Sequence, residues 1–66
     1  MKIADFTKPE LDYFRDNCNF VGIEKDLFEY RSQGFTLEEI AELTNMSIDG
    51  IKKVSKRVNR KIIKVI

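Results

Sequence analysis

The side chains of this 66-residue chain that could do chemistry are its bases, and they are concentrated towards its carboxyl end. Residues 46–66 hold seven bases and a single acid, a net charge of +6, whereas residues 1–45 hold five bases and ten acids, a net charge of −5. The formal net charge of +1 conceals this separation. A basic end on an acidic body favours binding to a polyanion, although a solvated basic helix would give the same charge count.

The absent and rare residue types remove most catalytic and metal-binding chemistry. The chain has no histidine and one cysteine, Cys18. It therefore cannot form a Cys/His zinc site, an internal disulfide, or a Ser/His/Asp or Cys/His catalytic set. Its carboxylates are spread over predicted helix surfaces. We expect a protein that is not an enzyme and that uses no cofactor and no metal.

Neither a membrane span nor a signal peptide is recognisable. No apolar run approaches the ~20 residues of a membrane span, and the start MKIADF is too acidic and too broken for a signal peptide. We expect a cytoplasmic protein without membrane contact. A chain this small gains only ~3–5 kcal/mol from its core, so unusually good packing or a partner must add to it.

The apolar spacing predicts a small all-α domain of four to five helices, the last of which carries the bases. Helices are expected over about residues 8–17, 23–32, 37–43 and from 48 onward. Capping boxes at residues 7–10 and 36–39 mark two of the starts, and Ser47 can cap the last helix. Gly34 and Asn45 suit the left-handed positions at which helices end.

The last predicted helix separates its apolar and basic residues onto opposite sides. Its inward stripe is expected to consist of Ile51, Val54, Val58 and Ile62. A rotation of ~100° per residue places on the opposite side Asp49, Lys52, Lys53, Lys56 and Arg60. Arg57 and Lys64 fall at the margin of that face. Gathering the bases on one outward side favours the binding interpretation over the solvated one.

The last two predicted helices meet the physical requirements of a helix-turn-helix, two helices joined by a short turn. Ala41 is the small residue where the helices touch, Asn45 tolerates the positive φ of the turn, and Ser47 caps the second helix. The apolar groups expected to lock the crossing angle are Ile40, Met46, Ile51 and Val54.

The run GFTLEEIAELTNMSIDGIKKVSKRVNRKI, residues 34–62, resembles the helix-turn-helix of LuxR/GerE-type regulators and, nearly as closely, region 4 of bacterial sigma factors. The matching positions are Gly34, Ile40-Ala41, Met46-Ser47, Ile51 and Arg60-Lys61-Ile62. The family's preceding helix corresponds to Phe20, Glu24, Leu27 and Phe28, so the resemblance covers about residues 20–62. Asn45 stands where the family mostly has Gly, and Gly50 where it prefers Thr or another larger residue.

The resemblance implies that the helix from Ile48 enters the major groove of double-stranded DNA. The implied DNA-binding residues are Thr36, Ser47, Asp49, Lys52, Lys53, Lys56, Arg57 and Arg60. Two alternatives stay open. Asp49 either accepts a hydrogen bond from a cytosine amino group or simply suits the helix dipole, and the Thr36 and Ser47 hydroxyls either contact phosphate or only cap their helices.

The last residues, IIKVI, carry aliphatic side chains on both sides of the helix. Either the helix bends after about Lys61, or a partner covers Ile63. LuxR/GerE-type domains commonly dimerise through a helix that follows the recognition helix, which implies a homodimer surface here. Its expected members are Ile62, Ile63, Val65 and Ile66. The sequence leaves monomer and homodimer equally open.

A single domain is expected over residues 1–66, with an N-terminal helix and loop (1–19), a helix-turn-helix core (20–62) and a C-terminal tail (63–66). The predicted function is sequence-specific DNA binding by a small transcriptional regulator, of a size that suits a phage or mobile element. The alternative is a protein-interaction adaptor that resembles sigma region 4 and binds RNA polymerase or another regulator. Affinity for random-sequence duplex at low salt distinguishes the two.

Overall fold

Five helical elements make up the chain in the computed structural model, which describes residues 2–66. They are the short 3-10 helix η1 (Ile3–Asp5) and the α-helices α1 (Lys8–Asn17), α2 (Ile23–Ser32), α3 (Leu37–Thr44) and α4 (Ile48–Val65). No strand occurs within the described residues. The predicted all-α class and the predicted positions of the four α-helices are confirmed.

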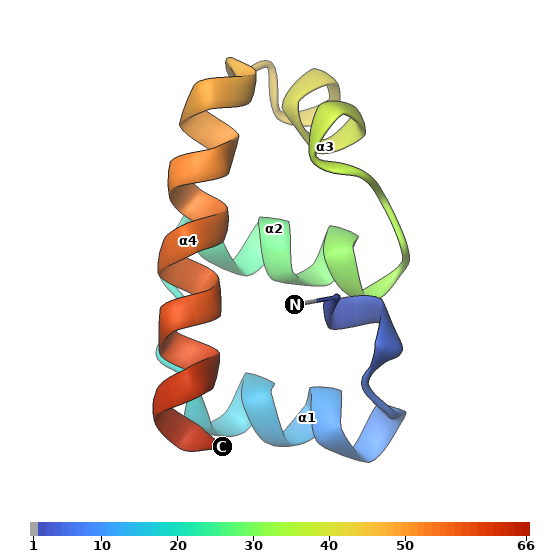
Figure 1. Ribbon diagram of the computed structural model, residues 1–66, viewed down its shortest axis with the longest axis vertical. Coiled ribbons are helices and arrows are strands. Elements are labelled where there is room, and N and C mark those ends of the chain that lie inside the picture. The colour runs from blue at the N-terminus through green and yellow to red at the C-terminus, as the bar shows by residue number, and fades with distance from the viewer. Residues whose placement is uncertain (1) are drawn as a thin grey trace.

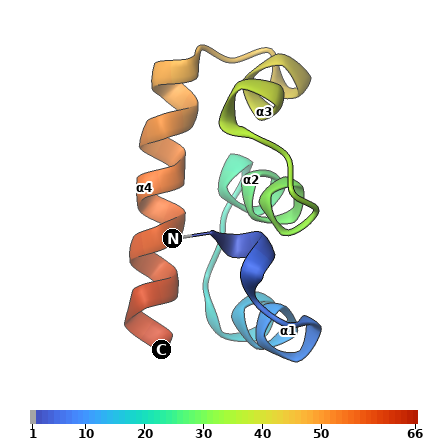
Figure 2. The same ribbon diagram turned by 45° about the vertical axis from the view of Figure 1, so that its right-hand side comes forward.

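The long helix α4 runs the length of the molecule, and the three shorter α-helices are stacked along it (Figure 1, Figure 2). α1 lies beside the carboxyl-terminal end of α4, α2 beside its middle and α3 beside its amino-terminal end. η1 packs on α2, between α2 and α1. The domain measures 29 × 18 × 18 Å, and α4 at 1.5 Å per residue is about 27 Å long. α4 thus spans nearly the whole length of the domain, and each of the other three α-helices packs on it.

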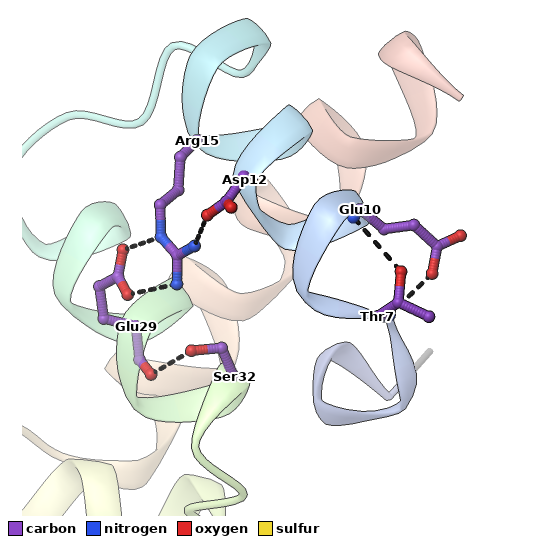
Figure 3. Close-up of polar contacts among 6 residues, drawn as sticks. All are labelled: Thr7, Glu10, Asp12, Arg15, Glu29 and Ser32. Atoms are coloured by element: carbon purple, nitrogen blue, oxygen red, sulfur yellow. Dashed lines mark hydrogen bonds and ion pairs between the residues drawn. The ribbon is translucent and has the colours of Figure 1, made fainter.

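The predicted capping boxes fix the starts of α1 and α3. The Thr7 hydroxyl accepts a hydrogen bond from the Glu10 N–H at 3.4 Å, and the Glu10 carboxylate accepts one from the Thr7 N–H at 2.8 Å (Figure 3). Thr36 and Glu39 repeat this arrangement at α3. Each box satisfies two backbone donors that a helix start otherwise leaves unpaired. Both helices therefore begin where the sequence predicts.

A left-handed residue ends α3 and sets the sharp corner before α4. Asn45 has φ 57° and ψ 38°, a conformation that Asn adopts more readily than other side-chain-bearing residues. Behind it, the Met46 N–H donates to the Ala41 carbonyl at 3.0 Å. Only three residues separate the two helices. The prediction of a tight turn at Asn45 is confirmed.

The core takes residues from every helical element. Its buried members are Ile3, Phe14, Cys18, Leu27, Phe28, Ile40, Ala41, Ile51, Val54, Val58 and Ile62. All four residues of the predicted α4 stripe are among them, so the expected rotation of α4 is confirmed. Met46, expected to help lock the crossing angle, is instead exposed. The turn places it at the rim of the core, not inside it.

The carboxyl-terminal residues continue α4 without interruption to Val65. Of the two explanations for the apolar end, a bend of the helix after about Lys61 is therefore wrong (Figure 1, Figure 2). Ile63 stays on the outer side of the continuous helix, as its position in the 3.6-residue period requires. Among the described residues, no helix combines the length and the apolar character that crossing a membrane requires.

Candidate nucleic-acid interface

The outward side of α4 carries five exposed bases. They are Lys52, Lys53, Lys56, Arg60 and Lys64. None of the five forms an ion pair with another residue in the range 2–66. Asp49, also exposed, stands in the first turn of the helix. The predicted outward face is thus present as a strip along the surface of α4, and Lys64, expected at its margin, is exposed with it. We call these five bases the basic face.

The basic face lowers the stability of its own helix. Lys52 and Lys56, and likewise Lys56 and Arg60, are four residues apart, and like charges at that spacing repel each other by a few tenths of a kcal/mol. The acid Asp49 precedes Lys52 by three residues and Lys53 by four, so it can offset these two charges but not those of Lys56, Arg60 and Lys64. A polyanion bound along this face would remove the repulsion.

Arg57 and Lys61 depart from the basic face and bind a buried carboxylate of α2. Glu24 is 5% exposed. Its Oε2 accepts a hydrogen bond from Arg57 Nε at 3.1 Å, and its Oε1 accepts one from Lys61 Nζ at 2.5 Å. Lys61 also donates to the Asn19 carbonyl. Arg57 is among the DNA contacts that the sequence predicts. In the structure it forms an ion pair with Glu24, and 48% of its side chain remains exposed.

Glu24 and its partner Lys61 are not among the site residues that the sequence predicts. The hydrogen bond from Lys61 holds the pKa of Glu24 below its ordinary value, with smaller contributions from the Val21 N–H and from Arg57. Burial acts in the opposite direction and does not prevail. Glu24 is therefore a carboxylate at neutral pH and fixes α4 against the start of α2.

The two capped helix starts differ in what they leave available. The Thr36 N–H is already bound to Glu39 Oε1 at 2.9 Å, and the Thr36 hydroxyl accepts from the Glu39 N–H at 3.1 Å. A phosphate at α3 would have to displace that carboxylate. The Ser47 hydroxyl accepts from the Gly50 N–H at 3.1 Å, and no carboxylate closes this start in return. Of the two residues predicted to contact phosphate, only Ser47 therefore lies at a helix start that no carboxylate occupies.

Gly50 lies under the cap of α4. A Cβ at this position would lie 3.2 Å from Ser47 Oγ and 3.4 Å from Met46 Cε. The first distance is shorter than an ordinary contact, so a side chain here would press on the Ser47 cap. Glycine therefore has a local packing reason at this position.

The predicted dimer surface is divided by the rotation of α4. Ile62 is 0% exposed and belongs to the core, so the prediction that it lies on a dimer surface is wrong. Ile63 and Ile66 are exposed at 63% and 76%, and Val65 is partly buried. Ile66 also borders an open groove of about 340 Å³ that Phe6, Pro9, Tyr13 and Phe14 help to line. Ile66 therefore lies beside α1, whereas Ile63 lies on the outer side of α4.

Comparison of this chain with protein-family models, with curated proteins and with solved structures found no match.

Proposed function

We propose that α3, the turn at Asn45 and α4 act as a helix-turn-helix that binds double-stranded DNA sequence-specifically, in a small cytoplasmic transcriptional regulator. The observation that carries this proposal is the basic face. Five exposed bases that pair with no acid among residues 2–66 occupy one side of the helix that follows a three-residue turn. Its opposite side is fully buried, so the face has a fixed direction.

The chemistry of the face suggests how DNA contacts are divided among its residues. Lys52, Lys53 and Lys56 lie nearest the start of α4 and reach base edges or phosphates in the major groove. Each lysine supplies a point charge with freely rotating donors, whereas Arg60 offers a planar fork suited to phosphate. Ser47 and the open start of α4 supply a hydroxyl and the helix dipole for a backbone phosphate. Lysines in the reading positions favour strong electrostatic binding with modest discrimination between bases.

Salt dependence tests the proposal directly. Each phosphate that a base neutralises contributes about −0.9 to the slope of log K against log salt concentration. We expect the double variant Lys53→Gln/Lys56→Gln to weaken binding to a labelled duplex and to flatten the slope by about 1.8. Fluorescence anisotropy over a series of salt concentrations measures both quantities.

Lys8→Gln/Lys25→Gln is the matched control. It removes the same charge from two exposed lysines of α1 and α2, so it should change the slope much less. Equal slopes for the two double variants would show that net charge, not the basic face, drives binding, and the proposal would fail. Selection of bound duplexes from a random pool then tests sequence preference.

The adaptor is the second candidate, and one observation favours it. The groove beside Phe6, Tyr13 and Ile66 is apolar and open, and Ile63, three residues before Ile66, is exposed on the outer side of α4. A protein that works only through this surface should bind random-sequence duplex weakly even at low salt. A homodimer formed through the same surface is part of this proposal, and sedimentation equilibrium with Ile63→Glu as the disrupting variant tests it.

A further inference from the structure

Two arginines of this chain bind glutamates of α2, and they use their nitrogens differently. Arg15 donates hydrogen bonds through all three of its guanidinium nitrogens. Its Nε and Nη2 donate to the two oxygens of Glu29 at 2.8 and 2.9 Å, and its Nη1 donates to Asp12 at 2.7 Å (Figure 3). Arg57 donates only through Nε, to Glu24. Its Nη1 and Nη2 bond to no residue in the range 2–66, and half of its side chain is exposed. Arg57 is held at one edge of its guanidinium and open at the other.

The carboxylate that holds Arg57 is itself fixed. Glu24 is buried, and its other oxygen accepts hydrogen bonds from Lys61 and from the Val21 N–H. Two donors from α4 and the Val21 N–H, just before α2, therefore determine where this carboxylate lies. A flexible arginine loses rotamer freedom when it binds a ligand, and a side chain already held in place loses less.

Arg57 also lies next to the basic face. It follows Lys53 by one helical turn and precedes Arg60 by three residues, so on the surface of α4 it stands beside the strip of bases. A planar fork with two free nitrogens matches two oxygens of one phosphate, which a lysine cannot do.

We propose that Glu24 is a positioning residue that holds Arg57 by its Nε so that the two terminal nitrogens form a ready-made clamp for a backbone phosphate of double-stranded DNA. This inference rests on the proposed function. It opposes the simplest electrostatic expectation, in which Glu24 only cancels positive charge and weakens DNA binding. The two views predict effects of opposite sign when the charge of Glu24 is removed.

The decisive variant is Glu24→Gln, measured by anisotropy with a random-sequence duplex. We expect its Kd to rise about threefold or more, although the chain becomes more positive, because Arg57 loses its charged anchor. In an Arg57→Ala background, Glu24→Gln should no longer weaken binding. The matched control is Glu29→Gln, which removes the same charge from the same helix but releases Arg15 on α1, and its Kd should not rise. A lower Kd for Glu24→Gln would overturn the inference.

Arg57→Lys supplies a second test that does not depend on how well Glu24→Gln folds. It keeps the charge and removes both the Nε anchor and the fork. We expect an unchanged salt slope with Kd about tenfold higher, the loss of one charge-assisted contact. A wild-type Kd would overturn the inference. If Lys53→Gln weakens binding while Arg57→Lys does not, only the clamp fails; if neither variant matters, the proposed function fails with it.

Discussion

The rotation of α4 decides which residues point outward, and the neighbours Ile62 and Ile63 test it in solution. Ile62 is completely buried and Ile63 is mostly exposed, although the two are chemically identical. One residue corresponds to ~100° of rotation. If α4 were rotated by that amount, Ile63 would be buried and the basic face would no longer point directly away from the core.

The expected losses in the free energy of unfolding follow from how deeply each isoleucine is buried. Replacing a buried isoleucine by alanine costs about 2–5 kcal/mol, and by valine about 0.5–1.5 kcal/mol. A domain of this size is stable by only ~3–5 kcal/mol, so Ile62→Ala should leave much of the protein unfolded. Ile62→Val should stay folded with a measurable loss. Ile63→Ala and Ile63→Val should each change the free energy of unfolding by less than about 0.5 kcal/mol.

Urea unfolding followed by far-ultraviolet circular dichroism gives these differences. The valine pair is the sharper comparison, since both variants remain folded and lose the same methyl group. An Ile63→Val loss equal to that of Ile62→Val would refute the rotation described here. If that loss grew with protein concentration, the reason would be a partner that covers Ile63, and the assignment of the free surface would change.

Three further predictions concern residues that fix α4. Because Lys61 lowers the pKa of Glu24, the stability that this pair contributes is complete above the ordinary pKa of 4.5 and is lost as the pH falls through the lowered value. Glu24→Gln should lower the free energy of unfolding by about 1–2 kcal/mol at neutral pH. It should also remove this part of the acid sensitivity, which urea titrations at about pH 6 and about pH 3 measure. Asn45→Ala should cost about 1 kcal/mol in the same assay, because alanine is less tolerant of φ 57°, and Asn45→Gly should lie within about 0.5 kcal/mol of wild type. Gly50→Ala should gain much less than the usual ~1 kcal/mol in thermal melts, because its Cβ presses on the Ser47 cap; a full gain would contradict that contact.

The helix positions and the inward stripe of α4 were predictable because they depend on local sequence. Capping boxes and apolar spacing act within a few residues, so the starts at Thr7, Thr36 and Ser47 follow from short segments. The left-handed turn at Asn45 is equally local. For the same reason, the direction of the basic face could be deduced from the helical period alone.

The ion pairs of Glu24 could not be predicted from such local rules. The residue is separated from Arg57 by 33 positions and from Lys61 by 37, and a glutamate in the first turn of a helix usually faces solvent. Only the packing of α2 across α4 brings the three together. Ile3 escaped prediction for a related reason: it lies in a short 3-10 helix, where apolar periodicity gives no signal, yet it is fully within the core.

The stacking of α1, α2 and α3 on one long helix makes α4 both the spine of the fold and the bearer of its candidate binding face. None of the three shorter α-helices can unfold and detach from α4 without exposing part of the shared core. Occupancy of the face is therefore thermodynamically linked to the whole domain: a ligand at a hundred times its Kd would add about 2.7 kcal/mol to global stability. For a domain this small, that is comparable to its entire margin, so the bound and free protein would differ greatly in resistance to heat and to proteolysis.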